Sequence, residues 1–304
     1  MPLYLISYQA SGMIHKAVFE NSGNGFRWIT LIFLMLMGAL IGMLTGFAIQ
    51  KLFGIADPES LASMRIMQLS TQIGLFFLPP LCWAFLFGTK PLDYLGLRSS
   101  PRGLLPVYGV LLMLSALPLV HGLAEWNQSV TLPESLSSIE QHFRGLEDRA
   151  TAITKTFLSV STSWELLFNL LMIAVIPALG EELLFRGVIQ KQLMHSTRNA
   201  HLAVIISSLI FSILHFQFFG LVPRFLLGLF LGYFYLWSGS LWVPVLMHFI
   251  NNALAVVAFY LHHNGSSQVA MEDFGAVSTW WQWTLSVLIS LSLCIAAYRQ
   301  RQVD

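Results

Sequence analysis

The stretch from Leu166 to Arg186 reads Leu-Leu-Phe-Asn-Leu-Leu-Met-Ile-Ala-Val-Ile-Pro-Ala-Leu-Gly-Glu-Glu-Leu-Leu-Phe-Arg. A strongly apolar run up to Leu179 leads into two adjacent acids, Glu181 and Glu182, and Arg186 follows four residues later. An apolar run of this kind is typical of a helix buried in protein or lipid, where charged side chains are costly. The acids and the arginine therefore need a common explanation.

Two later apolar stretches carry histidines. They read Phe211-Ser-Ile-Leu-His215 and His248-Phe-Ile-Asn-Asn252. A charged side chain at bilayer depth costs roughly 2.5–3.5 kcal/mol even on lenient insertion scales, so such groups on neighbouring spans usually face a protein interior or a water-filled cavity. The sequence therefore predicts a buried polar site.

The composition is that of an integral membrane protein. Of the 304 residues, 56% are hydrophobic and only 10% are charged, which far exceeds the apolar share of an ordinary soluble domain. The net charge is +1 and the basic residues are scattered, which argues against a nucleic-acid partner. The partners we expect are the lipid bilayer and a membrane-bound protein or peptide.

About twenty apolar residues are needed to cross the hydrocarbon core as a helix. Windows of this kind predict an all-α, polytopic bundle of about eight transmembrane helices around the polar site. Pro79-Pro80 should kink or break the second span, and the sixth and seventh spans should form a tight hairpin. The expected spans are Trp28 to Ile49, Thr71 to Phe87, Leu104 to Leu123, Trp164 to Leu184, Leu202 to Phe219, Phe225 to Ser238, Leu241 to Leu261 and Trp280 to Tyr298.

These spans divide the chain into five parts. We expect an N-terminal polar segment (1–27), three transmembrane helices (28–123), a polar connector (124–163), a catalytic core of four spans (164–261), and a loop with the final span (262–304). The connector places Leu136, Ile139, Phe143 and Leu146 at three- and four-residue steps, a spacing that predicts an amphipathic helix on the membrane or on the bundle. It can act as a lid or docking surface, although a solvated connector helix explains the pattern more simply.

The positive-inside rule favours both termini in the cytoplasm, and we expect the inner membrane of a bacterium. An N-terminus inside leaves only Lys51, Arg65, Arg144, Arg149, Lys155 and Arg224 outside, together with the acids Glu134, Glu140, Glu147, Asp148, Glu272 and Asp273. The cytoplasmic side then holds Lys16, Arg27, Lys90, Arg98, Arg102, Arg186, Lys191, Arg198, Arg299 and Arg301.

The two acids cannot share one role if the helix continues through them. Adjacent helical residues differ by about 100° in direction, whereas Glu182 and Arg186 are spaced i and i+4, which allows an ion pair on one face. Glu181 is then free to project elsewhere. An unpaired carboxylate in a dry pocket resists ionisation and can act as a general base near neutral pH.

The histidines and Asn252 supply the remaining chemistry. His248 and Asn252 lie one turn apart and offer two donors, and such donors can hold the oxyanion of a tetrahedral intermediate. With His215 and a carboxylate base, they are sufficient for water attack on an amide carbonyl. Two histidines and a glutamate also suit zinc, but the His-Glu-x-x-His pattern of common zinc proteases is absent, so zinc and a metal-independent mechanism both stay open.

The three motifs, in this order on successive spans, resemble those of the CPBP family of intramembrane proteases, also called Abi. This family includes the CAAX prenyl endopeptidase and proteins linked to bacteriocin processing. The resemblance covers Ala178 to Asn252 and implies that Glu181 activates water and that His215 positions it. It also implies that His248 and Asn252 stabilise the oxyanion, that Glu182 and Arg186 support the site, and that the cavity opens toward the cytoplasm.

The sequence thus predicts an intramembrane endopeptidase, which the family name classes as a metalloendopeptidase. Three alternative hypotheses compete with this prediction. A serine mechanism would use Ser238 or Ser240 with His248, but it leaves the acids unexplained. A proton-coupled transporter also buries acids and histidines, although no inverted repeat is visible. A non-proteolytic membrane scaffold would keep the same polar residues without cleaving its partner.

Overall fold

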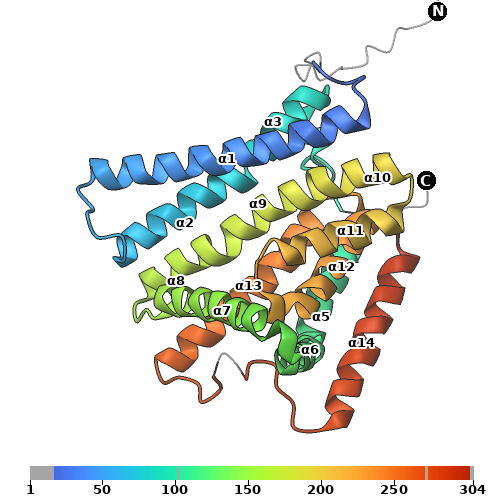
Figure 1. Cartoon of the computed structure of the whole chain (residues 1–304). Coiled ribbons are helices and arrows are strands. Elements are labelled where there is room, and N and C mark those ends of the chain that lie inside the picture. The colour runs from blue at the N-terminus through green and yellow to red at the C-terminus, as the bar shows by residue number, and fades with distance from the viewer. Residues whose placement is uncertain (1–16, 102, 271–272, 302–304) are drawn as a thin grey trace, which may run out of the picture.

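The computed structural model describes residues 17–101, 103–270 and 273–301, and the regular elements in these residues are all helical (Figure 1). The expected all-α, polytopic membrane fold is confirmed. Lys16, Arg102 and Glu272, which entered the charge comparison, lie outside the described residues, as do the first 16 residues of the N-terminal segment.

Six helical stretches of the described chain are long and apolar enough to cross a membrane. Three of them contain more than one helical element. The six are α1 (Asn24–Leu52), α2 with α3 (Leu61–Phe76 and Leu78–Phe87), the central helix Ser163–Thr197, η4 with α12 (Phe218–Gly220 and Leu221–Ser238), α13 (Trp242–His263) and α14 (Trp280–Arg299).

The third and fifth expected spans differ from a regular crossing. The third is a pair of helices, α5 (Leu105–Ser115) and α6 (Leu117–Ser129), bent by 48°. Pro118 in the first turn of α6 cannot continue the hydrogen bonding of α5, which accounts for the break. The fifth is α11 (Ala200–Ile213), whose 14 residues extend about 21 Å, less than the roughly 30 Å hydrocarbon core.

The predicted break at Pro79-Pro80 is confirmed. Helix α2 ends at Phe76 and α3 begins at Leu78, so both prolines lie in the first turn of α3, where a missing N–H costs nothing. The predicted hairpin is confirmed too, because Gly239 joins α12 to α13 in a left-handed conformation (φ 63°) that favours glycine. A short helix, α4 (Pro91–Tyr94), lies in the loop between α3 and α5.

Helices α1 and α2 lie side by side at unusually short range (Figure 1). A Cβ added to Gly38 would lie 2.2 Å from the carbonyl oxygen of Gly74, and one added to Gly74 would lie 2.3 Å from that of Gly38. Small residues permit such backbone contact, which is a main source of helix association in membranes. The glycines therefore fix the packing of this helix pair.

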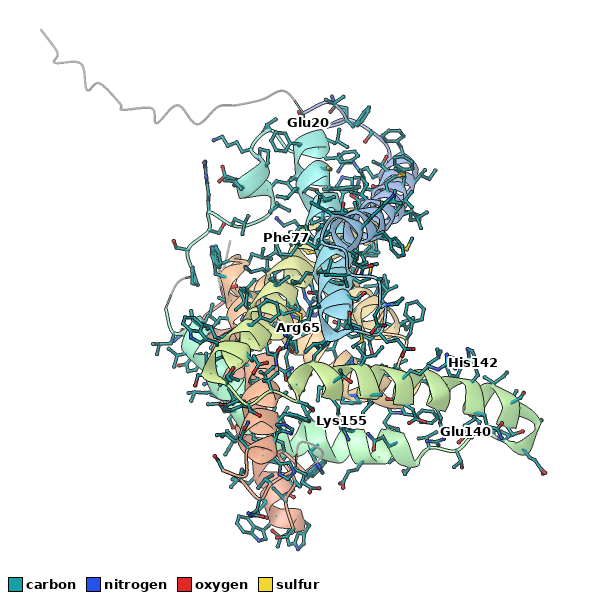
Figure 2. The ribbon with its side chains drawn as sticks, turned by 90° about the vertical axis from the view of Figure 1, so that its left-hand side faces the viewer. Glu20, Arg65, Phe77, Glu140, His142 and Lys155 are labelled. Carbon is teal, nitrogen blue, oxygen red and sulfur yellow. The ribbon has the colours of Figure 1, made fainter. Side chains whose placement is uncertain are left out.

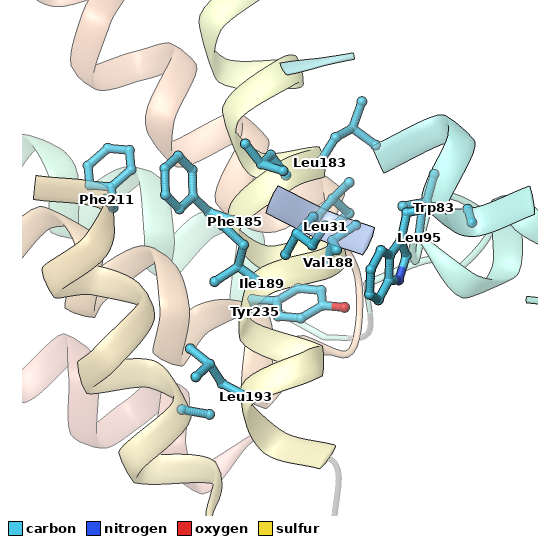
Figure 3. Close-up of a cluster of buried hydrophobic side chains, with 14 of the residues drawn as sticks. Leu31, Trp83, Leu95, Leu183, Phe185, Val188, Ile189, Leu193, Phe211 and Tyr235 are labelled. Carbon is cyan, nitrogen blue, oxygen red and sulfur yellow. The ribbon is translucent and has the colours of Figure 1, made fainter. Parts of the chain in front are cut away.

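Helices α1 and α3 pack against the rest of the bundle through one apolar cluster (Figure 3). Leu31 of α1 and Trp83 of α3 pack with residues of the central helix such as Leu183 and Val188. Tyr235 of α12 closes the cluster. The central helix is thus enclosed on several sides, which explains why it can carry charged residues at depth.

Both ends of the described chain lie on the same side of the bundle. Near the start of α1, the Trp28 indole donates to Ser196 Oγ (3.2 Å). After α14, Gln300 Oε1 accepts from the Leu104 amide (3.0 Å) at the start of α5. The α12–α13 turn is on this side as well, since Trp242 Nε1 donates to the Leu97 carbonyl (2.8 Å).

The connector lies on the opposite side of the bundle. After the short turn η1 (Glu134–Leu136) it forms α7 (Ser137–Leu158), which extends away from the helices (Figure 2). Only part of its apolar stripe packs, because Leu136 and Ile139 are exposed whereas Phe143 stacks on Phe218 of η4 (5.5 Å). The helix is thus docked on the loop after α11.

Glu140 holds the N-terminal turn of α7 in place. Its carboxylate accepts from the Leu132 amide (2.7 Å) and from Arg144 Nε (2.8 Å), and these two contacts hold the pKa of Glu140 below its usual range. The start of the central helix is capped in a similar way, because Thr162 and Glu165 form a reciprocal capping box.

We predict that Gly38→Ala lowers the unfolding midpoint of the purified protein, while Gly25→Ala leaves it nearly unchanged. A Cβ at Gly38 meets backbone, whereas one at Gly25 meets nothing within 4 Å, and overpacking of this kind typically costs about 1–3 kcal/mol. Thermal unfolding in a mild detergent measures both. Equal midpoints for the two variants would contradict the proposed backbone contact.

Candidate active site

The central helix carries the acids near its middle. It runs for 35 residues from Ser163 to Thr197, so Glu181 does not lie at the end of a span that stops at Leu184. Its segments are α8 (Ser163–Asn169), the π-helical η2 (Leu170–Val175), α9 (Ile176–Leu184), the π-helical η3 (Phe185–Gln190) and α10 (Lys191–Thr197). Wide π-turns inside α-helices are common at functional sites, and here they flank α9.

Glu182, Arg186 and His248 form a buried ionic network. Arg186 Nη1 lies 3.0 Å from Glu182 Oε1, as the i and i+4 spacing predicts. The same oxygen accepts from His248 Nδ1 at 2.8 Å, and Arg186 Nη2 donates to the Gly228 carbonyl at 3.0 Å. Both Glu182 and Arg186 have no exposed surface. This network fixes the ring of His248 and joins the central helix to α12 and α13.

Glu181 is oriented differently from its neighbour. Its Oε2 lies 4.0 Å from His248 Nε2, and this atom has no hydrogen-bond partner in the described part of the chain. His248 therefore directs one ring nitrogen toward each of the two acids. The structure thus contains the Glu182–Arg186 pair that the sequence spacing allows, and Glu181 faces His248 instead of Arg186.

Asn252 is positioned by a proline on the central helix. Pro177 lacks the N–H that would bond to the Ile173 carbonyl in a regular α-helix. Asn252 Nδ2 donates to that carbonyl at 3.2 Å, and its Oδ1 accepts from Asn251 Nδ2 at 3.1 Å. One N–H of the Asn252 amide is left for a ligand, since the group carries two.

His215 has a defined proton. Its Nδ1 lies 2.7 Å from the Phe211 carbonyl oxygen, which can only accept, so Nδ1 carries hydrogen and Nε2 of the neutral ring is an acceptor. The centre of the Phe211 ring lies 4.9 Å from that of His215 and 5.9 Å from that of His248. It also contacts Phe185 edge-on at 5.1 Å (Figure 3). Phe211 thus contacts both imidazole rings.

These residues meet at a cavity of about 120 Å³. Four of the six expected site residues line it, and the other two, Glu182 and Arg186, lie behind it in the ionic network. The lining residues are Glu181, His215, His248 and Asn252, together with Phe211, Arg224, Asn251, Met113, Leu227 and Leu231.

Arg224 and Asn251 are lining residues that the sequence reasoning missed. Arg224 entered it only as an outside loop charge, yet it lies in an apolar run between Leu221 and Leu227. The cost of a charge at depth, which singled out the acids, was a signal that also applied to Arg224. Asn251 gave no such signal, because its neighbour Asn252 accounted for the motif.

The polar residues do not fit a zinc site held by three protein ligands. Within the described residues, no three His, Cys, Asp or Glu side chains gather closely enough to hold a metal ion. His248 directs Nδ1 to Glu182, and His215 directs Nδ1 to the backbone. The serine alternative lacks support as well, because neither Ser238 nor Ser240 is among the residues lining the cavity; both hydroxyls bond within or near the α12–α13 turn.

Comparison with known proteins agrees with the motif resemblance. Residues 163–254 match the family model described as type II CAAX prenyl endopeptidase Rce1-like. This segment contains all six expected site residues. The match supports the resemblance to the CPBP family for this part of the chain.

A curated relative is the uncharacterized protein YpbD of Bacillus subtilis (strain 168). It is 31% identical over 99 residues, which cover 31% of this chain and 48% of YpbD. The chain thus matches about half the length of that relative. No solved structure matches the chain.

We predict that Glu182→Gln strongly destabilises the protein, whereas Glu181→Gln does not. Removing one partner of a buried ion pair leaves an uncompensated charge and typically costs about 3–5 kcal/mol. Thermal unfolding of the detergent-purified variants measures the difference. The double variant Glu182→Gln/Arg186→Met should regain stability because it removes the orphaned guanidinium. A Glu182→Gln variant as stable as Glu181→Gln would show that the pair is not structural.

Proposed function

We propose that this chain is an intramembrane endopeptidase that hydrolyses a peptide bond in a membrane-associated or lipid-modified protein, with Glu181 as the general base. One observation carries the proposal: Glu181, His215, His248 and Asn252, from three separate segments, line the same cavity. The Rce1-like match to residues 163–254 supports the reaction class.

In the proposed reaction, Glu181 takes a proton from a water molecule, whose oxygen bonds to the carbonyl carbon of the substrate. Glu181 suits this role because it lines the cavity, whereas Oε1 of Glu182 is engaged by Arg186 and His248. The acceptor Nε2 of His215 orients the water. The C–N bond then breaks as Glu181 returns the proton to the leaving amine.

The oxyanion of the tetrahedral intermediate is assigned to His248 and Asn252. Asn252 keeps one amide N–H after its bond to Ile173. His248 donates from Nε2 when the ring is protonated, while its Nδ1 donates to Glu182. Loss of one oxyanion donor typically costs roughly 2.7–4 kcal/mol of transition-state stabilisation.

We also propose that the protein resides in a bacterial inner membrane with both chain ends in the cytoplasm. The charge comparison supports this orientation. The cavity-lining His215 and Arg224, however, belong to the half of the bundle that carries α7, away from the chain ends. With the chain ends in the cytoplasm, a cavity that opens on that half faces the outside. This conflicts with the cytoplasmic opening that the family resemblance implies.

We predict that cells with the wild-type chain contain protein termini that are absent from cells with Glu181→Gln at matched expression. Quantitative terminal-peptide analysis of the membrane proteome measures this and reveals the substrate. Glu59→Gln, which changes an exposed acid at the α1–α2 loop, is the control and should match the wild type. Identical termini in all three strains would favour the scaffold or transporter alternatives.

We predict that a cysteine at Glu20 reacts with a membrane-impermeant maleimide only after the cells are permeabilised, while one at His142 reacts in intact cells. Glu20 and His142 are exposed. Figure 2 shows Glu20 at the top of the molecule and His142 on the projecting helix α7. The start of α1 contacts the end of the central helix at Ser196, whereas the end of α7 contacts its start at Asn169. Cys82 and Cys294 are first replaced by alanine, and the charge-based orientation supplies the expected direction. The reverse labelling pattern would place the chain ends outside and the α7 half in the cytoplasm.

A further inference from the structure

Arg224 is a cation that lines the cavity. Its guanidinium donates to the side-chain and backbone oxygens of Gln217, a neutral residue. No carboxylate among the described residues forms an ion pair with it. Arginine presents five N–H donors, so its bonds to Gln217 leave hydrogen-bonding capacity for a further acceptor.

Two acids, Glu147 and Glu181, act electrostatically on Arg224, but in the described residues neither forms an ion pair with it. Glu147 Oε2 accepts from the Phe219 amide at 3.1 Å. Glu181 faces His248 and is the proposed base. The structure thus keeps a guanidinium at the cavity, and no carboxylate among the described residues neutralises it in an ion pair.

The connector helix α7 holds the loop next to Arg224 in place. Phe143 of α7 stacks on Phe218, and the Arg144 guanidinium lies 3.9 Å from the centre of the Phe219 ring. These contacts hold the loop that separates His215 from Arg224. The guanidinium is therefore preorganised, as a binding group should be.

We infer that Arg224 binds a carboxylate of the substrate, and this inference rests on the proposed function. The planar guanidinium fork matches a carboxylate with two parallel hydrogen bonds. A peptide supplies that group in two ways, as its terminal carboxylate or as an acidic side chain near the cleaved bond. Arg224 then determines specificity, while Glu181 performs the chemistry.

The test measures binding rather than cleavage. The full chain is purified in a neutral detergent, and its thermal unfolding midpoint is followed with three probes: N-acetyl-leucine (terminal carboxylate), N-acetyl-aspartamide with a free side-chain carboxylate, and N-acetyl-leucinamide (uncharged). A ligand that binds the folded state raises the midpoint with concentration. We expect one or both carboxylates to produce a saturable rise and the amide to produce none; whichever acid acts identifies the source.

Variants separate Arg224 from other causes. Arg224→Gln should abolish the rise or weaken apparent binding by about tenfold or more, as expected for a lost charge-assisted bond, and Arg224→Lys should keep part of it because the charge remains without the fork. Arg149→Gln on the exposed face of α7 should behave as wild type. Glu181→Gln should retain the response, so failure of the protease proposal would not remove it. Equal responses to acid and amide, no response in the wild type, or an unchanged response in Arg224→Gln would overturn the inference.

Discussion

A guanidinium with no exposed surface sits inside a membrane helix, and the site is arranged around it. Arg186 needs a counter-charge and acceptors because an unpaired buried charge costs several kcal/mol. Glu182 and the Gly228 carbonyl provide them. The carbonyl is within reach because α12 packs closely on α11, where a Cβ on Gly228 would lie 2.9 Å from Ser208. One buried charge therefore fixes the relation of three helices.

The same network separates support from chemistry. Glu182 Oε1 serves both Arg186 and His248, so the imidazole is held by an acid that itself cannot move. Glu181, one residue earlier, points to the cavity because adjacent helical positions differ by about 100°. Two chemically identical side chains thus receive different environments from helix geometry alone.

Local spacing made part of this predictable. The Glu182–Arg186 pair, the Pro79-Pro80 break and the α12–α13 hairpin follow from contacts between residues close in sequence, and the structure contains each of them. The bond between His248 and Glu182 does not, since it joins residues 66 positions apart whose approach depends on tertiary packing. The predicted end of the central helix at Leu184 was wrong. Charges that normally mark the end of a span are here enclosed by protein, and the helix continues to Thr197.

The short α11 explains why the connector belongs to the site. A helix of 14 residues that starts near the chain ends reaches only about 21 Å, so the loop carrying His215 turns inside the depth of the bundle. Irregular backbone at membrane depth is tolerated only where protein or a cavity covers it. Helix α7 and Asn127 provide that cover: Glu147 bonds to the Phe219 amide, and Asn127 bonds to the Phe218 carbonyl and the Val222 amide. The connector is thus needed because the polar site interrupts a membrane span, and its docking places His215 and Arg224 on the same cavity.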